Sequence, residues 1–181
     1  MATNFEVADS WARGIDPQNR PRAANMFYEC TRIYSYGHHY ILARRYNRNG
    51  NTYALINSAA TSITTTKHKS VVARAITRHS GRYMFVPNVA ADCETAHVGN
   101  MDYLLACLTP TRLFVAKSDR KRLSVVNVTE KSLRNAMDYA AFFGVAIPTR
   151  HRIDRPTAMR IATELSPELT RALVAAGLVQ D

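Results

Sequence analysis

Two histidines, His39 and His68, are the residues of this chain best suited to proton transfer, because imidazole titrates near neutral pH. A nearby cation, Lys67 or Arg74, would hold a phosphate group while the two imidazoles exchanged protons with the substrate. Together these residue types would make a metal-independent nuclease. The sequence alone does not fix the distances between them, so this chemistry stays an alternative.

A structural role for His68 competes with the catalytic one. His68 shares one side of a helical wheel with Val72 and Ala75, which is the side expected to face a core. A half-buried imidazole there would bond to a neighbouring strand, for example to Ser35 or Tyr36. The chain also lacks a glycine-rich phosphate loop, a nucleophile elbow and a His-Glu-x-x-His motif. We therefore favour a protein that is not an enzyme.

The cysteines do not form a metal-binding pattern. Cys93, His97 and Cys107 could be joined by His79, but no pair has the close Cys-x-x-Cys spacing that prepares a tetrahedral zinc site. Three cysteines, an odd number, also do not fit a disulfide framework. We predict reduced, mostly buried thiols, no metal and no cofactor.

Positive charge is concentrated in one acid-free segment. The chain has a formal net charge of +10, and residues 30–91 contain no Asp or Glu. The basic residues of that segment are Arg32, Arg44, Arg45, Arg48, Lys67, Lys69, Arg74, Arg78 and Arg82. Such a segment attracts polyanions, because neutralising phosphates releases counterions. A solvated basic face is the alternative.

Part of this charge is expected along one edge of a helix. On a helical wheel Lys67, Ser70, Arg74 and Arg78 fall in a narrow stripe opposite the apolar side. Three cations and a hydroxyl in a line suit a phosphate backbone. Arg44, Arg45 and Arg48 would extend the patch, and exposed tyrosines among them would stack bases. Buried aromatic ladders are the other use of these tyrosines.

The elements that must position these residues begin with a short helix and a sheet. Thr3 and Glu6 have capping-box spacing and predict a helix over residues 4–13 that ends at Gly14, followed by a loop or arm. Period-two patterns predict three strands, over residues 26–36, 39–47 and 51–62. Asn49-Gly50 predicts a hairpin between the last two.

We expect a helix to pack on this sheet and a further strand to join it. Thr64 or Thr65 is the expected cap of a helix that runs to about His79 and packs across one face. The pattern of residues 81–88 predicts a further strand. We expect the sheet over residues 26–86 to be antiparallel.

The second half of the chain is expected to be mainly helical. The patterns predict a helix over residues 95–108, a strand pair within 112–128 with a turn at 119–122, and a helix over 129–143. Two further helices, over 154–165 and 166–177, have proline in the first turn, and Ser166 and Gly177 bound the second.

These elements define an α+β fold: a small antiparallel β-meander with a packed helix, followed by a mixed, mainly helical C-terminal half. We divide the chain into an N-terminal helix and basic arm (1–25), the basic meander with its helix (26–90) and an α-rich part (91–181). The last is either part of the same domain or appended to it.

Residues 27–78 also contain a sequence pattern that resembles one found in other proteins. The segment resembles a domain of unknown function in bacteriophage and prophage proteins, with an aromatic-Ser-Tyr-Gly-x-His strand turn and a Ser-x-Thr-Thr-x-x-His helix start. The matching residues are Tyr34, Ser35, Tyr36, Gly37, His39 or His38, Asn57, Ser62, Thr64, Thr65, His68 and Ser70. The doublet His38-His39 departs from the single histidine of the pattern. The resemblance implies a viral origin more than an activity.

We therefore expect a phage-type accessory protein that binds nucleic acid through a basic, aromatic-rich face. The alternative from another class is an inhibitor or host-takeover protein that contacts an acidic host or phage protein. The apolar runs are short and the N-terminus lacks a signal-peptide layout, so we expect the cytoplasm, that of the host if viral, and no membrane contact. Oligomeric state, host and the choice of DNA or RNA stay open.

Overall fold

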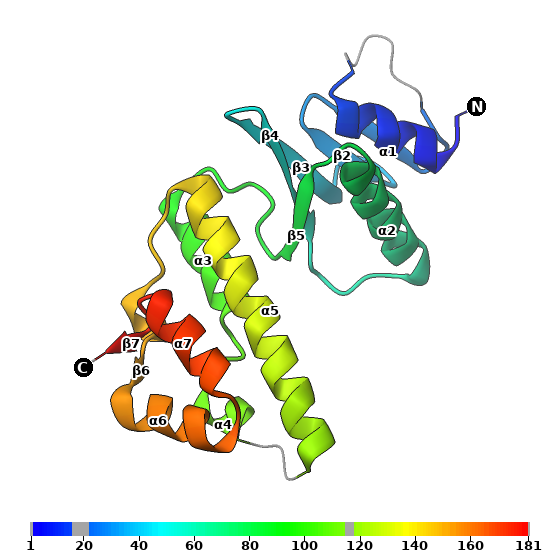
Figure 1. Cartoon of the computed structure of the whole chain (residues 1–181). Coiled ribbons are helices and arrows are strands. Elements are labelled where there is room, and N and C mark those ends of the chain that lie inside the picture. Colours follow the sequence, from blue (N-terminus) through cyan, green and yellow to red (C-terminus); the bar gives the residue numbers. More distant parts are fainter. Residues whose placement is uncertain (1, 16–21, 115–117, 181) are drawn as a thin grey trace. The chain divides into compact units, whose positions relative to one another are not determined.

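The protein is described from a computed structural model that covers residues 2–15, 22–114 and 118–180. The chain is an α+β protein that divides into two compact units, Met1–Ala96 and His97–Asp181. Among its described residues the first unit holds the sheet, two complete helices and the start of a third, and the second unit is mainly helical (Figure 1). The expected loop after Gly14 falls largely on residues 16–21, which lie outside the described residues.

Local sequence signals fix the first helix, α1 (Asn4–Arg13). The Thr3 side chain accepts a hydrogen bond from the Glu6 backbone, and the Glu6 carboxylate accepts one from the Thr3 backbone, which completes the predicted capping box. The helix ends at Gly14, whose φ of 75° is the left-handed conformation of a C-terminal cap. Both predicted ends of α1 are confirmed.

The sheet has five strands in the order β1-β2-β3-β4-β5. Their bounds are β1 (Met26–Glu29), β2 (Arg32–Ser35), β3 (Ile41–Arg48), β4 (Asn51–Asn57) and β5 (Arg82–Val86). β1 to β4 are antiparallel neighbours, and Asn49 and Gly50 form the predicted hairpin with φ of 49° and 75°.

Two details of the predicted sheet were wrong. Residues 26–36 form two strands rather than one, because Cys30 takes a φ of 48° and turns the chain between β1 and β2. β5 runs parallel to β4, not antiparallel, because the helix between them returns the chain to the same end of the sheet. The sheet is therefore mostly, not wholly, antiparallel.

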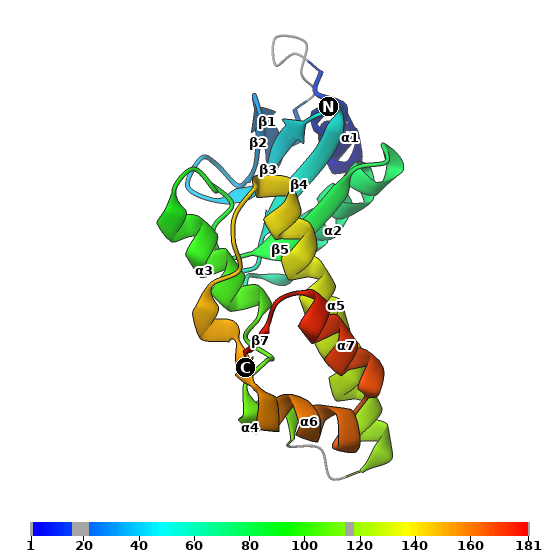
Figure 2. The same ribbon diagram turned by 60° about the vertical axis from the view of Figure 1, so that its left-hand side comes forward.

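The crossover helix α2 (Ile63–Arg78) packs on the sheet as predicted. Val72 and Ile76 are fully buried in a core shared with Trp11 of α1 and Ile56 of β4. Figures 1 and 2 show α1 and α2 side by side on the same face of the sheet. The cap is Ser62, which accepts a hydrogen bond from the Thr65 backbone, so the prediction of Thr64 or Thr65 was wrong.

The second unit differs more from its prediction. Its helices are α3 (Glu94–Leu104), which begins just inside the first unit, α4 (Pro110–Leu113), α5 (Asp119–Phe143), α6 (Arg155–Glu164) and α7 (Pro167–Ala175). No strand pair exists among the described residues of 112–128, since α5 occupies residues 119–143. A short parallel pair, β6 (Ile153–Asp154) and β7 (Val179–Gln180), joins the segment before α6 to the segment after α7.

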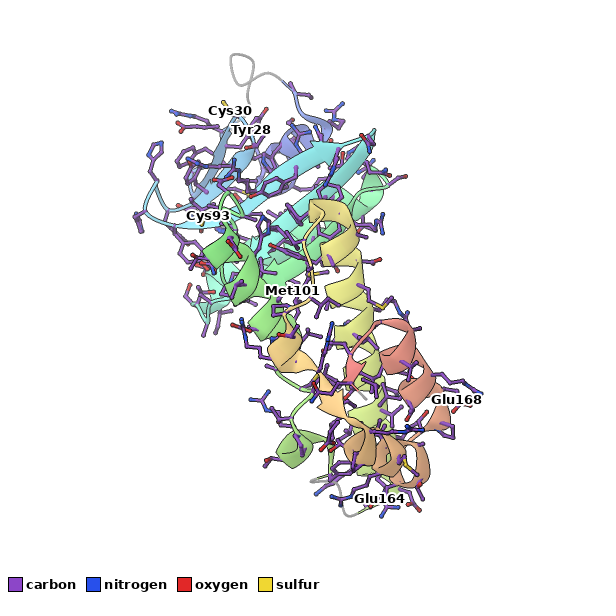
Figure 3. All side chains as sticks on the ribbon, turned by 90° about the vertical axis from the view of Figure 1, so that its left-hand side faces the viewer. Tyr28, Cys30, Cys93, Met101, Glu164 and Glu168 are labelled. Atoms are coloured by element: carbon purple, nitrogen blue, oxygen red, sulfur yellow. The ribbon has the colours of Figure 1, made fainter. Side chains whose placement is uncertain are left out.

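The two C-terminal helices form where their start signals lie. Ser166 accepts a hydrogen bond from the Leu169 backbone, and Gly177 follows α7 with a φ of 67°. Figure 3 places Glu164 and Glu168 on either side of the turn between α6 and α7. Across the described residues, no helix combines the length and apolar character needed to cross a membrane.

Gly14 offers a direct test of how α1 is joined to the sheet. A Cβ at Gly14 would lie 2.7 Å from Nη2 of Arg45, and the positive φ would itself be strained. We expect Gly14→Ala to lower the free energy of unfolding by about 1–2 kcal/mol through the backbone alone, with a further loss as Arg45 is displaced. Gly50→Ala is the matched control, because Gly50 has the same φ of 75° but nothing within 4 Å.

Urea denaturation followed by the fluorescence of Trp11, the single tryptophan, would measure both variants. An equal loss in the two would show that the contact between Gly14 and Arg45 contributes nothing.

Candidate nucleic-acid interface

The predicted stripe exists on α2. Lys67, Ser70, Arg74 and Arg78 are all exposed, while Val72 and Ile76 on the other side are buried. The stripe forms because residues three and four apart share one face of a helix. Its exposure is the structural feature that the sequence prediction required.

Three of these residues line a hollow beside the sheet. The hollow has a volume of about 590 Å³ and is lined by Ser70, Ala73, Arg74, Thr77, Arg78, Tyr83 and Phe85. The first five belong to α2 and the last two to β5, the edge strand. The hollow is therefore a groove between one helix and one strand, and we call it the α2–β5 groove.

Tyr83 and Phe85 are the functional candidates that the sequence analysis missed. They alternate with the buried Met84 and Val86, so both rings leave β5 on the face that carries α2. The rings are 41% and 39% exposed, 5.9 Å apart between centroids and nearly perpendicular, at 89°. Period-two alternation in residues 82–86 was a usable signal, but the parallel pairing of β5 was not predicted.

Most of the strand tyrosines belong to the core. Tyr28 and Tyr53 are among the largest fully buried side chains, and Tyr34 is 5% exposed. Tyr36, which follows β2, is 48% exposed. The aromatic rings that line the groove with the basic stripe are therefore those of β5, Tyr83 and Phe85, and not those of the hairpin.

The charges of the stripe differ in how far they are compensated. Among the described residues, Lys67 and Arg74 have no ion-pair partner. The guanidinium carbon of Arg78 lies 5.6 Å from the centre of the Phe5 ring. The positive charge of Arg78 also contributes to lowering the pKa of Asp9. The hydrogen bond from His79 to Asp9 (2.8 Å) is the main cause of the lowered pKa of that carboxyl. Arg74 is thus the least compensated cation that lines the groove.

The strand arginines do not extend the stripe as expected. Arg44 lies on the sheet face away from α2, where it pairs with Asp92 and stands over the Tyr46 ring. Arg45, the next residue along, points to the opposite face and lies against Gly14, at the end of α1. The cause is strand alternation, which sends consecutive side chains to opposite faces.

Burial lowers the pKa of the Arg45 side chain. Arg48 is exposed at the hairpin end of β3. None of the three strand arginines lines the α2–β5 groove.

His68 has the buried, bonded position that its helical face predicted. It is 3% exposed, with Nδ1 2.8 Å from Oγ of Ser35 and Nε2 3.0 Å from Nδ2 of Asn4. An amide nitrogen can only donate, so Nε2 accepts and Nδ1 carries the proton that is donated to Ser35. Burial lowers the pKa of His68, in agreement with a neutral ring. The imidazole joins α1, β2 and α2.

This geometry does not assemble the two-histidine alternative. Both ring nitrogens of His68 are engaged, whereas His39 is exposed after Gly37. No hydrogen bond or ring contact joins the two histidines within the part of the chain that the structure describes. His38, the other member of the doublet, contacts Glu29 at 3.0 Å.

The prediction of mostly buried thiols was wrong, because Cys30 and Cys93 are exposed and Cys107 is only half-buried. Nδ1 of His97 lies 2.8 Å from the Tyr139 hydroxyl, and Cys107 is a free thiol. Figure 3 shows Cys30 and Cys93 at well-separated places in the first unit. Over residues 2–15, 22–114 and 118–180, no three His, Cys, Asp or Glu side chains gather as they would around a metal ion.

Comparison with known protein families gave no match, and neither the curated proteins nor the solved structures gave one. The case for a function therefore depends on the geometry of the α2–β5 groove and the charge of the segment that forms it.

Proposed function

We propose that this chain is a phage-type accessory protein that binds nucleic acid through the exposed stripe of α2 and the α2–β5 groove. The observation that carries the proposal is the position of Arg74 and Arg78 beside the exposed rings of Tyr83 and Phe85. Guanidinium groups bind phosphates, and aromatic faces bind bases, so one groove offers both kinds of contact.

The charge of the surrounding chain supports the proposal. Residues 30–91 contain no acidic residue, so no carboxylate of that segment competes with phosphate for the cations of α2. Ser70 lies on the same edge, but its hydroxyl donates a hydrogen bond of 3.2 Å to the Thr66 carbonyl, so the support for phosphate binding comes from the cations.

The resemblance of residues 27–78 to a phage and prophage domain supports the viral origin. Ser35 and His68, from the two halves of that pattern, are hydrogen-bonded to each other, which gives the spacing a physical reason. Their bond stabilises the unit that presents the stripe, and it does not bear on what the stripe binds.

A charge-neutralising triple variant tests the proposal. Lys67→Gln, Arg74→Gln and Arg78→Gln together should weaken binding of both DNA and RNA oligonucleotides at low salt. The slope of log affinity against log salt should fall by about 0.7–0.9 for each lost phosphate contact. Fluorescence anisotropy over a salt series would measure both effects.

A variant with the same loss of charge elsewhere is the control. Lys131, Arg134 and Arg155 are exposed on α5 and α6, and their replacement by glutamine removes three positive charges without touching the stripe. If both triple variants behave alike, net charge and not the stripe explains the binding. Absence of any binding at low salt would contradict the proposal and leave an acidic protein as the partner of this face.

A further inference from the structure

We infer that the α2–β5 groove binds an unpaired strand, with a base stacked on Tyr83 or Phe85 and its phosphates on Arg74 and Arg78. The inference rests on the proposed function and names its substrate class, single-stranded nucleic acid. It follows from the shape of the groove and from the chemistry of its two sides.

The floor of the groove offers ring faces to a ligand. Tyr83 and Phe85 lie on the edge strand and are 41% and 39% exposed. Among the other described Phe, Tyr and Trp residues of this unit, Tyr36 alone reaches that exposure, and it does not line the groove. A base in a duplex has both faces covered by its neighbours, so only an unpaired base can stack on such a ring. Exposed rings therefore favour a single strand.

The two rings are not equivalent for a given base. Their planes meet at 89° with centroids 5.9 Å apart. One base can stack face to face on only one of the rings, and the other ring then meets the base edge. The groove can therefore stack one base at a time on a ring face, and the second ring then borders that base on one side.

The helical side of the groove provides the phosphate contacts. Arg74 and Arg78 are four residues apart on α2, so they stand about 6 Å apart along the helix axis. Both line the same hollow as the rings. A strand running along α2 would thus meet two cations on one side and an aromatic floor on the other.

The position of the rings and cations favours a flexible strand over a duplex. Proteins that read duplex DNA insert a projecting helix or ribbon into a groove of the nucleic acid. Here the cations and rings line an open hollow of about 590 Å³ and do not project from the surface as a reading helix does. That volume falls in the range of about 300–1,000 Å³ typical of sites for small ligands, which suits a nucleotide of a flexible strand.

Three oligomers of about equal charge test the inference on the intact chain. They are a short oligothymidine, an abasic phosphodiester of the same length, and a thymidine–adenosine duplex of half that length. We expect the oligothymidine, and the corresponding oligouridine, to bind more tightly than the other two. This comparison needs no variant, so it does not depend on whether an altered protein folds.

Variants then locate the stacking contact. Tyr83→Val and Phe85→Val keep a residue that favours strands but remove the aromatic face. The loss of the stacking ring should weaken oligothymidine binding by about 5- to 150-fold and leave binding of the abasic oligomer unchanged. Tyr103→Leu is the control, because Tyr103 is 49% exposed on α3 and does not line the groove.

The outcomes separate this inference from the proposed function. If no oligomer binds at low salt, the proposed function fails. If the duplex or the abasic oligomer binds as tightly as oligothymidine, or if both valine variants match the unaltered chain, the function stands and the inference is overturned. Circular dichroism of each variant confirms that the sheet is intact.

Discussion

Trp11→Ala is expected to lower the free energy of unfolding by about 3–5 kcal/mol. Trp11 is completely buried between α1, the sheet and α2, and it is one of the largest side chains in that core. Its Nε1 also donates a hydrogen bond of 3.0 Å to the Thr31 carbonyl, in the turn between β1 and β2. The alanine variant would therefore leave both a cavity and an unpaired carbonyl oxygen.

Trp11→Phe separates these two contributions. Phenylalanine fills most of the cavity but cannot donate to Thr31, so we expect a smaller loss, on the order of 1–3 kcal/mol. Because both variants lack the single tryptophan, urea denaturation should be followed by circular dichroism, with amide exchange of β3 as the readout for this unit. A loss below about 1 kcal/mol for the alanine variant would contradict the described core.

Local signals predicted the parts of the fold that depend on a few neighbouring residues. The capping box at Thr3, the end of α1 at Gly14 and the Asn49-Gly50 hairpin each need only one turn of chain. The turn at Cys30 could not be predicted in this way, because cysteine has no preference for a positive φ. Tertiary contacts set that turn, among them the bond from Trp11 to Thr31.

The error in α5 has a different cause. Residues 123–128 are rich in β-branched and apolar side chains, which suggested a strand. Val126, Thr129, Leu133 and Ala136 are buried along one face, with the three- and four-residue spacing of a helix. That periodicity crosses the boundary that the prediction placed at residue 129. Because the segment was divided there, the single helix over residues 119–143 was not recognised.

The sequence predicted the helical side of the candidate site but not its aromatic side. The stripe of α2 depends only on helical periodicity, and the four predicted residues are exposed together. The aromatic side of the groove depends on β5 pairing in parallel with β4 at the edge of the sheet, which involves residues about thirty positions apart. No pattern within residues 82–86 carries that information.

His68→Ala is expected to lower the free energy of unfolding by about 1–3 kcal/mol at neutral pH, because Ser35 and Asn4 lose a shared partner inside the protein. The loss can be followed by Trp11 fluorescence, since the tryptophan lies in the same core. His38→Ala, at an exposed position, is the control and should cost little.

The pH dependence of that loss distinguishes a neutral buried imidazole from a buried imidazolium cation. Burial lowers the pKa of His68 below its unfolded value of about 6.5, so the unfolded chain binds the proton more readily than the folded one. The stability that His68 contributes is therefore complete above pH of about 6.5 and is lost as the pH falls toward the lowered folded pKa. The difference between the unaltered chain and His68→Ala should shrink over that interval. A difference that grows on acidification would mean that the folded protein holds His68 as a cation.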